Sequence, residues 1–250
     1  MVSDKKIKLC AKNIVEAMNL KKGDCVLIQG GVHSQRLLER CAIEVMNKGG
    51  SPLITSTSDR FMKEMFEEVP FDSFEVVPRH LVGATKELDV NLRIEPYEDP
   101  AIAHTFAEDK VKARMESHLP ISEIIHDPAK GKKWLYAGWP TKGMAKMYGL
   151  DYSKLEKYII DGMLIPYKEL SDKGKRISGA LSNAEYVHVK DKNGTDIKMR
   201  IFGRRANISD GYISEEDVAR GQRGSNLPTG EVYYAPHEDS CEGNIYCPLT

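Results

Sequence analysis

The sequence predicts an α/β protein with a Rossmann-like parallel sheet in its N-terminal half and a β-rich α+β region after it. Three observations predict this class. Strand-like and helix-like patterns alternate over residues 1–130, a stretch with both tryptophans and several helical patterns follows, and short strand patterns fill the rest. Parallel neighbours need crossover connections of helix length, and the alternation therefore favours a parallel sheet in the first half.

The first βα unit follows an opening helix. Apolar residues at helical spacing predict that helix at Ile7, Cys10, Ile14 and Met18. The apolar run CVLIQ then predicts a strand, and Gly30 and Gly31 turn the chain into a second helix. One face of this helix is apolar and Gly49 and Gly50 close it; the face consists of Leu37, Leu38, Cys41, Ala42 and Val45.

The next elements continue the alternation. PLITST predicts a strand and DRFMKEMFEEVP a helix, with Asp59 as the N-cap and Phe61, Met65 and Phe66 on the buried side. In ELDVNLRIEP, apolar and polar residues alternate strictly, which predicts a strand with one dry and one wet face. DPAIAHTFAEDKVKARMESH predicts one long helix that Pro120 ends or kinks.

The character of the chain changes after residue 130. A strand, a Gly-Trp-Pro turn and two or three helices are expected there, and Trp134 and Trp139 mark an aromatic-packed junction. Asn193-Gly194 between two alternating runs predicts a β-hairpin whose two central residues both have positive φ. GEVYYAP and EGNIYCP predict two further short strands. We expect an N-terminal α/β domain over residues 1–175 and a second domain over residues 176–250.

Composition excludes several classes of function. With 36 Lys and Arg against 37 Asp and Glu, the net charge of -1 gives no general attraction to nucleic acid or anionic lipid. No apolar run reaches the ~18 residues of a membrane span, so no membrane role is expected. The five cysteines are scattered without a Cys-x-x-Cys pair, which favours a reduced, cytoplasmic protein. Small molecules or peptides are the expected partners.

Common catalytic motifs are missing from the sequence. The Gly30-Gly31 turn lacks the third glycine of a dinucleotide fingerprint and the Lys of a P-loop, so ordinary turn chemistry is favoured over nucleotide binding. There is no Gly-x-Ser-x-Gly elbow, and the seven histidines form no His-x-x-x-His or His-Glu-x-x-His pair. Covalent catalysis therefore has no support in the sequence.

The stretch NLPTGEVYYAP, from Asn226 to Pro236, is the one candidate site. Glu231 follows Pro-Thr-Gly and begins a strand, so a rigid proline and a permissive glycine position its carboxylate through the backbone. Such an oxygen can bind a metal ion. The local pattern by itself favours the other interpretation, a solvated carboxylate at the end of a strand, and leaves both open.

Three segments carry a family resemblance. GWPTKGMAKMYGLDYSKLEKYIIDGM, GTDIKMRIFGRR and above all NLPTGEVYYAPHEDSCEGNIY resemble the aminopeptidase T family of thermophilic metallopeptidases, in particular its shorter, leucyl aminopeptidase-like branch. The resemblance is weak before residue 130 and clear after it. It implies that the second domain is the first part of a metallopeptidase catalytic domain, and that Glu231 is a ligand of a metal centre with two divalent ions.

The resemblance also implies the activity: removal of N-terminal residues from peptides, with zinc, cobalt or manganese activating a bridging water. The other ligands and the catalytic carboxylate of the family come later than EGNIY, and we expect a chain ending at Thr250 to lack them and to be a poor enzyme by itself. No residue here is assigned a catalytic role, and His237 is not expected to be a ligand. A homodimer is the implied assembly.

Two alternatives remain at this stage. The same branch resembles the dihydroxypyridine dioxygenases, which would bind one iron on a related scaffold for oxygen-dependent ring cleavage. The other alternative is a non-catalytic fragment that binds a partner or dimerises, because an open sheet edge after EGNIYCP would need a cover.

Overall fold

The computed structural model describes residues 2–127 and 129–247, so Thr250, the end of the sequence, lies outside the described residues. The chain forms two compact units, and each is described by itself. Unit 1 contains the residues up to Ile165 together with Gly211–Thr229, and unit 2 contains Pro166–Asp210 and the residues from Gly230 onward.

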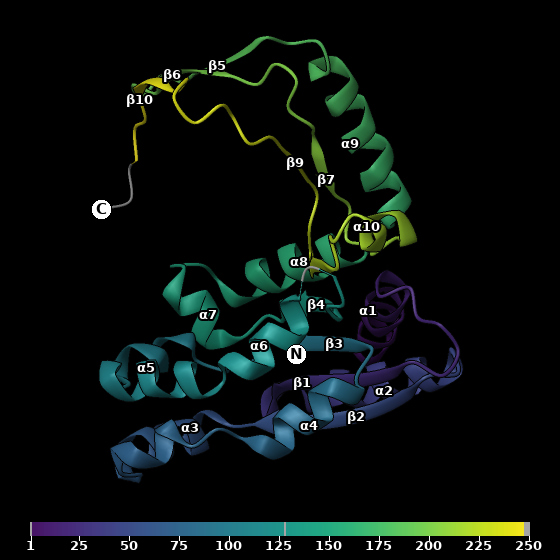
Figure 1. The fold of residues 1–250 in the computed structure, drawn as a ribbon, viewed down its shortest axis with the longest axis vertical. Helices are drawn as coiled ribbons and strands as arrows, with labels where there is room; N and C mark the ends of the chain where they lie inside the picture. The colour runs from purple at the N-terminus through teal and green to yellow at the C-terminus, as the bar shows by residue number, and fades with distance from the viewer. Residues whose placement is uncertain (1, 128, 248–250) are drawn as a thin grey trace. The chain divides into compact units, whose positions relative to one another are not determined.

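Unit 1 is built on a five-stranded sheet in the order β2-β1-β3-β4-β8, in which every neighbouring pair is parallel. The strands are β1 (Cys25–Gly31), β2 (Ser51–Thr57), β3 (Val90–Ile94), β4 (Lys133–Ala137) and β8 (Gly224–Leu227). Figure 1 shows β1 to β4 side by side. The expected α/β class with a parallel N-terminal sheet is confirmed.

Helices connect the strands on both faces of this sheet. The α-helices of unit 1 are α1 (Asp4–Ala17), α2 (Gln35–Asn47), α3 (Asp59–Glu68), α4 (Arg79–Glu87), α5 (Glu108–Ser117), α6 (Leu119–His126), α7 (Lys142–Met147), α8 (Tyr152–Met163) and α10 (Glu215–Ala219). Short 3-10 helices are η1 (Val32–Ser34), η2 (Phe71–Glu75) and η3 (Pro100–Thr105). Along the sheet, the connection from β1 to β2 runs towards one edge, and the connection from β2 to β3 runs back past β1 towards the other edge. Because such connections are right-handed, α2 and α4 lie on opposite faces of the sheet.

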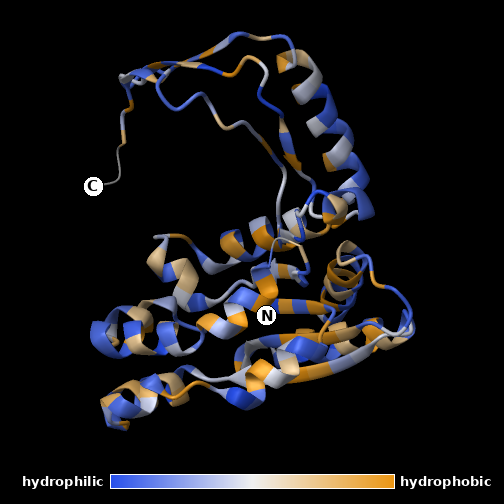
Figure 2. Cartoon of the chain, viewed as in Figure 1, coloured by the Kyte–Doolittle hydropathy of each residue, from blue (hydrophilic) through white to orange (hydrophobic). Residues whose placement is uncertain are grey.

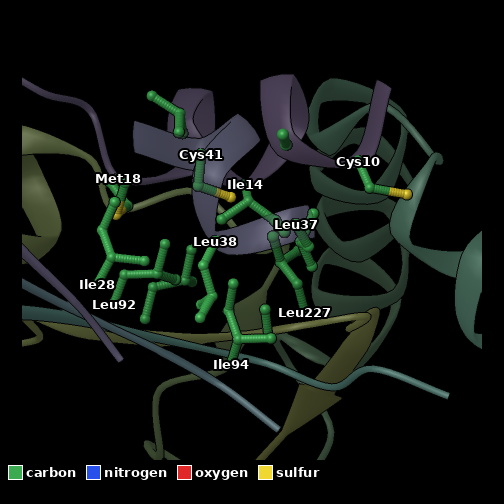
Figure 3. Close-up of a cluster of buried hydrophobic side chains, with 14 of the residues drawn as sticks. Cys10, Ile14, Met18, Ile28, Leu37, Leu38, Cys41, Leu92, Ile94 and Leu227 are labelled. Carbon is green, nitrogen blue, oxygen red and sulfur yellow. The ribbon is translucent and has the colours of Figure 1, made fainter. Parts of the chain in front are cut away.

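The main core lies where α1 and α2 cover the sheet. Figure 3 shows this cluster, in which side chains of α1, α2 and the strands meet: Cys10, Ile14, Met18, Leu37, Leu38, Cys41, Ile28, Leu92, Ile94 and Leu227. In Figure 2 the apolar colours gather in the strands of the sheet, while the helices also carry polar colours. The apolar faces predicted for the first two helices are all buried, which confirms them.

The third helix differs from its prediction. Ser58 is the N-cap of α3, and its side chain accepts a hydrogen bond from the Phe61 backbone N–H. The Asp59 carboxylate instead accepts from the backbone N–H groups of Glu98 and Asp99, at 3.0 and 2.7 Å. The burial predicted for Phe66 is confirmed, but Met62 is the other buried residue of the helix, while Phe61 is 56% exposed and Met65 is half-buried.

The long helix expected over residues 99–118 is also different. The chain forms η3, α5 and then α6, and Pro120 lies in the first turn of α6 rather than ending a helix. A proline is tolerated there because the N–H that it lacks has no partner within the first turn.

Unit 2 contains a long helix and two small antiparallel sheets. The helix is α9 (Tyr167–Leu181); the first sheet has the order β10-β6-β5, with β5 (Tyr186–Lys190), β6 (Asp196–Arg200) and β10 (Glu242–Asn244). The second sheet pairs β7 (Asn207–Ser209) with β9 (Glu231–Tyr233).

The predicted hairpin between β5 and β6 is present, but its turn is of another kind. Gly194 has a φ of 114°, whereas Asn193 is not among the residues with positive φ. The Asp191 carboxylate accepts hydrogen bonds from the backbone N–H groups of Asn193 and Thr195 and holds a longer loop together. Hydrogen bonds to the Asp191 side chain therefore stabilise this turn, in place of the positive φ at both central residues that the expected two-residue turn would have required.

The compact units differ from the division expected at residue 175. Unit 2 begins at Pro166, before α9, and Gly211–Thr229 return to unit 1. The return has a simple cause, because β8 joins the parallel sheet as the neighbour of β4. Within the described residues, no helix combines the length and the apolar character needed to cross a bilayer.

Candidate functional site

The segment Asn226–Pro236 starts at the edge of the parallel sheet. Asn226 and Leu227 end β8, and the Leu227 carbonyl accepts a hydrogen bond of 2.8 Å from the Gly138 N–H. Leu227 is 9% exposed and belongs to the main core. At the start of the strand, the Trp134 ring packs on the bare backbone of Gly224, where an added Cβ would lie 1.9 Å from Cε2. The strand therefore fixes where the candidate segment begins.

Pro228 continues this anchoring within unit 1. It follows Leu227 in a cis peptide bond and packs on Gly162 of α8, where an added Cβ would lie 3.0 Å from the proline Cβ. Gly211 lies against Leu227, and its φ of 90° suits glycine alone among the common residues. Close packing on two glycines leaves the Leu-Pro pair little freedom.

Glu231 is the first residue of β9 in unit 2. It pairs with Ser209 of β7, and Gly230 before it has a φ of 140°. Both strands contact α9: Ile208 packs on Gly174, and the Tyr234 hydroxyl donates to the Ser178 carbonyl at 3.3 Å. Figure 1 shows β7 and β9 side by side. Strand pairing and helix packing thus set the backbone that carries Glu231.

The Glu231 side chain itself is exposed. No hydrogen bond or ion pair of its carboxylate occurs with any of the described residues. A carboxylate on a fixed backbone with open oxygens can accept a metal ion, and it can equally remain solvated, so both sequence interpretations are compatible with this geometry.

The metal centre implied by the resemblance is not assembled by the part of the chain that the structure describes. Across residues 2–127 and 129–247, no three His, Cys, Asp or Glu side chains come together in a way that could hold a metal ion. One carboxylate is too few, since catalytic divalent ions take about three or more protein ligands. The described residues alone therefore do not fit a bound metal.

His237, six residues after Glu231, has a structural role. Its Nε2 lies 2.9 Å from the Phe202 carbonyl, and its backbone N–H donates to the Arg200 carbonyl. Ser240 links the same two segments, because its hydroxyl donates to the His237 carbonyl and accepts from the Arg200 N–H. These bonds tie the chain after β9 to β6.

His188 and Asp196 form a hydrogen bond across the hairpin. The His188 Nε2 lies 2.6 Å from the Asp196 Oδ1, and Lys190 lies 3.0 Å from the other carboxylate oxygen. The hydrogen bond from His188, followed by that from Lys190, lowers the pKa of the Asp196 carboxyl. All three side chains are exposed, which makes this a support of the hairpin rather than a reactive centre.

Sequence reasoning missed a buried polar group at the carboxyl end of the parallel sheet. Glu95 was expected on the wet face of β3 but is only 5% exposed, and it accepts a hydrogen bond of 2.7 Å from the Tyr136 hydroxyl. Burial raises the pKa of this carboxyl. The pKa of His33, after β1, is lowered by burial. The two residues follow β1 and β3, the strands between which the strand order reverses, and this order was not part of the sequence prediction.

Comparison with known proteins matches the chain to a family. The family model described as thermophilic metalloprotease (M29) matches residues 3–249. The solved structure of wild-type AmpT from Thermus thermophilus is similar to this chain with a TM-score of 0.68 and 18% identity, over 96% of this chain and 63% of that chain.

A second solved structure is more distant. The 2,5-dihydroxypyridine dioxygenase from Pseudomonas putida KT2440 matches with a TM-score of 0.54 and 15% identity, over 97% of this chain and 59% of that chain. At such identities the two likenesses show a shared fold. The chain spans less than two thirds of either solved protein, 63% and 59% of their lengths. No curated protein sequence matches it.

Proposed function

This chain belongs to the thermophilic metalloprotease (M29) family, and we propose on that premise that it acts as a metal-dependent aminopeptidase that removes N-terminal residues from peptides. The observation that carries the proposal is the family match over residues 3–249. The fold shared with AmpT supports it, with the higher TM-score of the two solved structures. Neither the identity of the metal nor the number of ions follows from the fold; zinc, cobalt or manganese, two ions to a site, is part of the proposal.

Glu231 is proposed as a metal ligand. Its support is local: the NLPTGEV segment that carries the resemblance places this carboxylate at the start of β9, exposed and without a partner among the described residues. The described residues contribute to the site by positioning the Glu231 carboxylate. Ile208 on Gly174 holds the β7–β9 pair against α9, and this packing limits where the carboxylate can lie.

Peptides are the proposed substrates and a homodimer is the proposed assembly, both on the family resemblance. A cytoplasmic location is proposed on the cysteines. All five are free thiols, and Cys10 and Cys41 are fully buried in the core. Burial raises the pKa of the Cys10 thiol to about 12, so it stays protonated and unreactive at neutral pH.

The test of the ligand assignment is Glu231→Gln in the full gene product, with Glu242→Gln as the matched control. Both residues are exposed and begin short strands of unit 2, β9 and β10. We expect Glu231→Gln to lower bound divalent metal and the release of N-terminal residues together, each by at least about tenfold. The control should stay within about twofold of the parent in both.

Metal content is measured by elemental analysis after equilibration with a limiting amount of each ion, and activity on an unblocked peptide. A Glu231→Gln protein that keeps both its metal and its activity removes Glu231 from the site. It would leave the aminopeptidase proposal standing, because that rests on the family match.

A further inference from the structure

A cavity of about 630 Å³ opens in unit 1 among α3, η2, α4 and α5, and no residue of the candidate segment lines it. Its size falls within the range of small-molecule sites, roughly 300 to 1,000 Å³. The walls combine two arginines, with no acidic side chain among the lining residues, and apolar side chains that are exposed to water.

The basic wall contains Arg79, His80, Arg114 and His118, its charge comes from the two arginines, and none of the lining residues is Asp or Glu. The Arg114 guanidinium lies 3.7 Å from the Met65 sulfur, which is a weak acceptor and does not neutralise it. No carboxylate of the described residues lies within ion-pair distance of Arg79 or Arg114. The positive field is therefore local, because the chain as a whole has a net charge of -1.

Lys110 adds positive charge behind this wall. Its ammonium donates to the Phe66 and Val69 carbonyls, at 2.8 and 2.7 Å, and lies 5.5 Å above the Phe74 ring. Its partners in these contacts are carbonyls and a ring, and none of them is a carboxylate that would offset its charge.

The two arginines supply the permanent positive charge of this wall. The His118 Nδ1 lies 2.8 Å from the Arg114 carbonyl, which fixes the tautomer that donates there. Burial, together with the Arg114 charge, lowers the pKa of His118 and keeps the ring neutral. A guanidinium stays charged at any ordinary pH and pairs with a carboxylate through two parallel hydrogen bonds.

The remaining walls are mainly apolar, with Ser73 and Ser117 as their polar members. Phe74 is buried at the base, while Val76 and Val77 are 67% and 42% exposed and Leu81 is 38% exposed. An inorganic anion would gain nothing from these three side chains, whereas a hydrocarbon body would remove them from water. The complement of these walls is an anion with an apolar body.

We propose that this cavity binds an apolar monocarboxylate, with its carboxylate paired to Arg114 and Arg79 and its hydrocarbon body against Val76, Val77 and Leu81. A free alkyl carboxylic acid and the C-terminal residue of an apolar peptide share this chemistry. The site is independent of the metal and of the proposed peptidase activity, so the test uses metal-free protein.

The experiment is calorimetric titration of the full protein with decanoate, and with 1-decanol as the neutral match. Three variants are compared with the parent: Arg114→Gln, Arg79→Gln and, as the control, Arg60→Gln. Arg60 is an exposed arginine of α3 that does not line the cavity, so it removes the same charge elsewhere. Arg79 is exposed, and its variant preserves the test if Arg114→Gln, which is half-buried, fails to fold.

We expect decanoate to bind at one saturable site and decanol about tenfold more weakly or worse. Arg114→Gln and Arg79→Gln should each weaken decanoate by about tenfold, and Arg60→Gln by less than about twofold. Equal binding of decanol, or an equal loss in Arg60→Gln, overturns the proposal, as does the absence of saturable binding.

A second pair of ligands separates the sources. The peptide acetyl-Leu-Leu-Phe with a free C-terminal carboxylate is compared with the same peptide as its C-terminal amide. Tighter binding of the peptide acid than of decanoate supports a peptide C-terminus as the occupant, and the reverse order supports a free acid. An amide that binds as tightly as the acid contradicts the proposal, because the guanidinium groups would then have no role.

Discussion

Gly224→Ala tests the packing that joins β8 to the sheet and fixes the start of the candidate segment. An added Cβ would lie 1.9, 2.1 and 2.4 Å from Cε2, Cζ2 and Nε1 of the Trp134 ring. Ordinary contact needs about 3.5 Å, so the ring or the strand must move by about 1.6 Å, the difference between 3.5 and 1.9 Å.

The ring can make only part of this movement. Trp134 meets His126 edge-on at 5.9 Å, and its backbone N–H donates to the Arg223 carbonyl at 2.9 Å. It is half-buried, so partial rotation towards water relieves some of the clash. We therefore expect a loss of about 2 to 3 kcal/mol in the free energy of unfolding, the upper part of the range for overpacking.

The assay is urea denaturation followed by circular dichroism. Gly138→Ala is the control, because its Cβ would meet only Leu227 and Pro228 at 3.7 and 3.9 Å, and we expect a change within about 0.5 kcal/mol. In a Trp134→Ala background the cost of Gly224→Ala should fall to a similarly small value, about 0.5 kcal/mol. A cost that persists without the ring, or one no larger than that of Gly138→Ala, refutes the packing argument.

Three further predictions concern stability. Trp139→Ala should cost about 3 to 5 kcal/mol, because the side chain is 6% exposed in the main core; an unchanged urea midpoint would show that its burial contributes nothing. Gly174→Ala should destabilise unit 2 by about 1 to 2 kcal/mol, since its Cβ would lie 2.4 Å from the Ile208 Cγ2 and a gain of about 1 kcal/mol in helix propensity offsets part of the clash. Adding Ile208→Ala should relieve the clash. Hydrogen exchange of the α9 amides that is equally fast in Gly174→Ala and in the double variant would argue against the contact. In the folded state, burial raises the pKa of Glu95 above its ordinary value of 4.5, so its stabilising contribution is present below pH 4.5 and is lost as pH rises through the folded-state pKa. The Glu95→Gln variant should therefore lose less stability than the parent between acid and neutral pH. Identical profiles of stability against pH would show that Glu95 titrates normally.

The parallel sheet was predictable because its signals are local and redundant. In β3, Val90, Leu92 and Ile94 alternate with polar residues, and all three are fully buried. The apolar face of α2 follows the helical period, and Gly49 with its φ of 81° ends the helix as the sequence indicated. Periodicity and turn chemistry agree in these elements, so the sequence alone identifies them.

β8 could not be predicted in the same way. Gly224, Ser225 and Asn226 carry no apolar pattern and are typical of turns, and Leu227 is the one core residue of the strand. The strand exists because the edge of β4 offers hydrogen bonds and the Trp134 ring needs a residue without a Cβ. Both are tertiary causes, and they also explain why residues 211–229 fold with unit 1.

The sequence identified the segment that contains Glu231 but not the buried polar group at the carboxyl end of the parallel sheet. Proline and glycine before Glu231 indicated a backbone-positioned carboxylate, and the structure has it exposed at the start of β9. The burial of Glu95 was beyond local pattern, because strict alternation assigned it to the solvated side of β3. Its partner Tyr136 lies on the neighbouring strand, 41 residues away in sequence.

The most direct test of the proposed activity is the release of N-terminal residues from an unblocked peptide by the full gene product. We expect release that a chelator abolishes and zinc, cobalt or manganese restores, with no release from the N-acetylated peptide. No release with any of these ions, together with oxygen uptake by the iron-loaded protein on a dihydroxypyridine, would contradict the account and identify a dioxygenase instead.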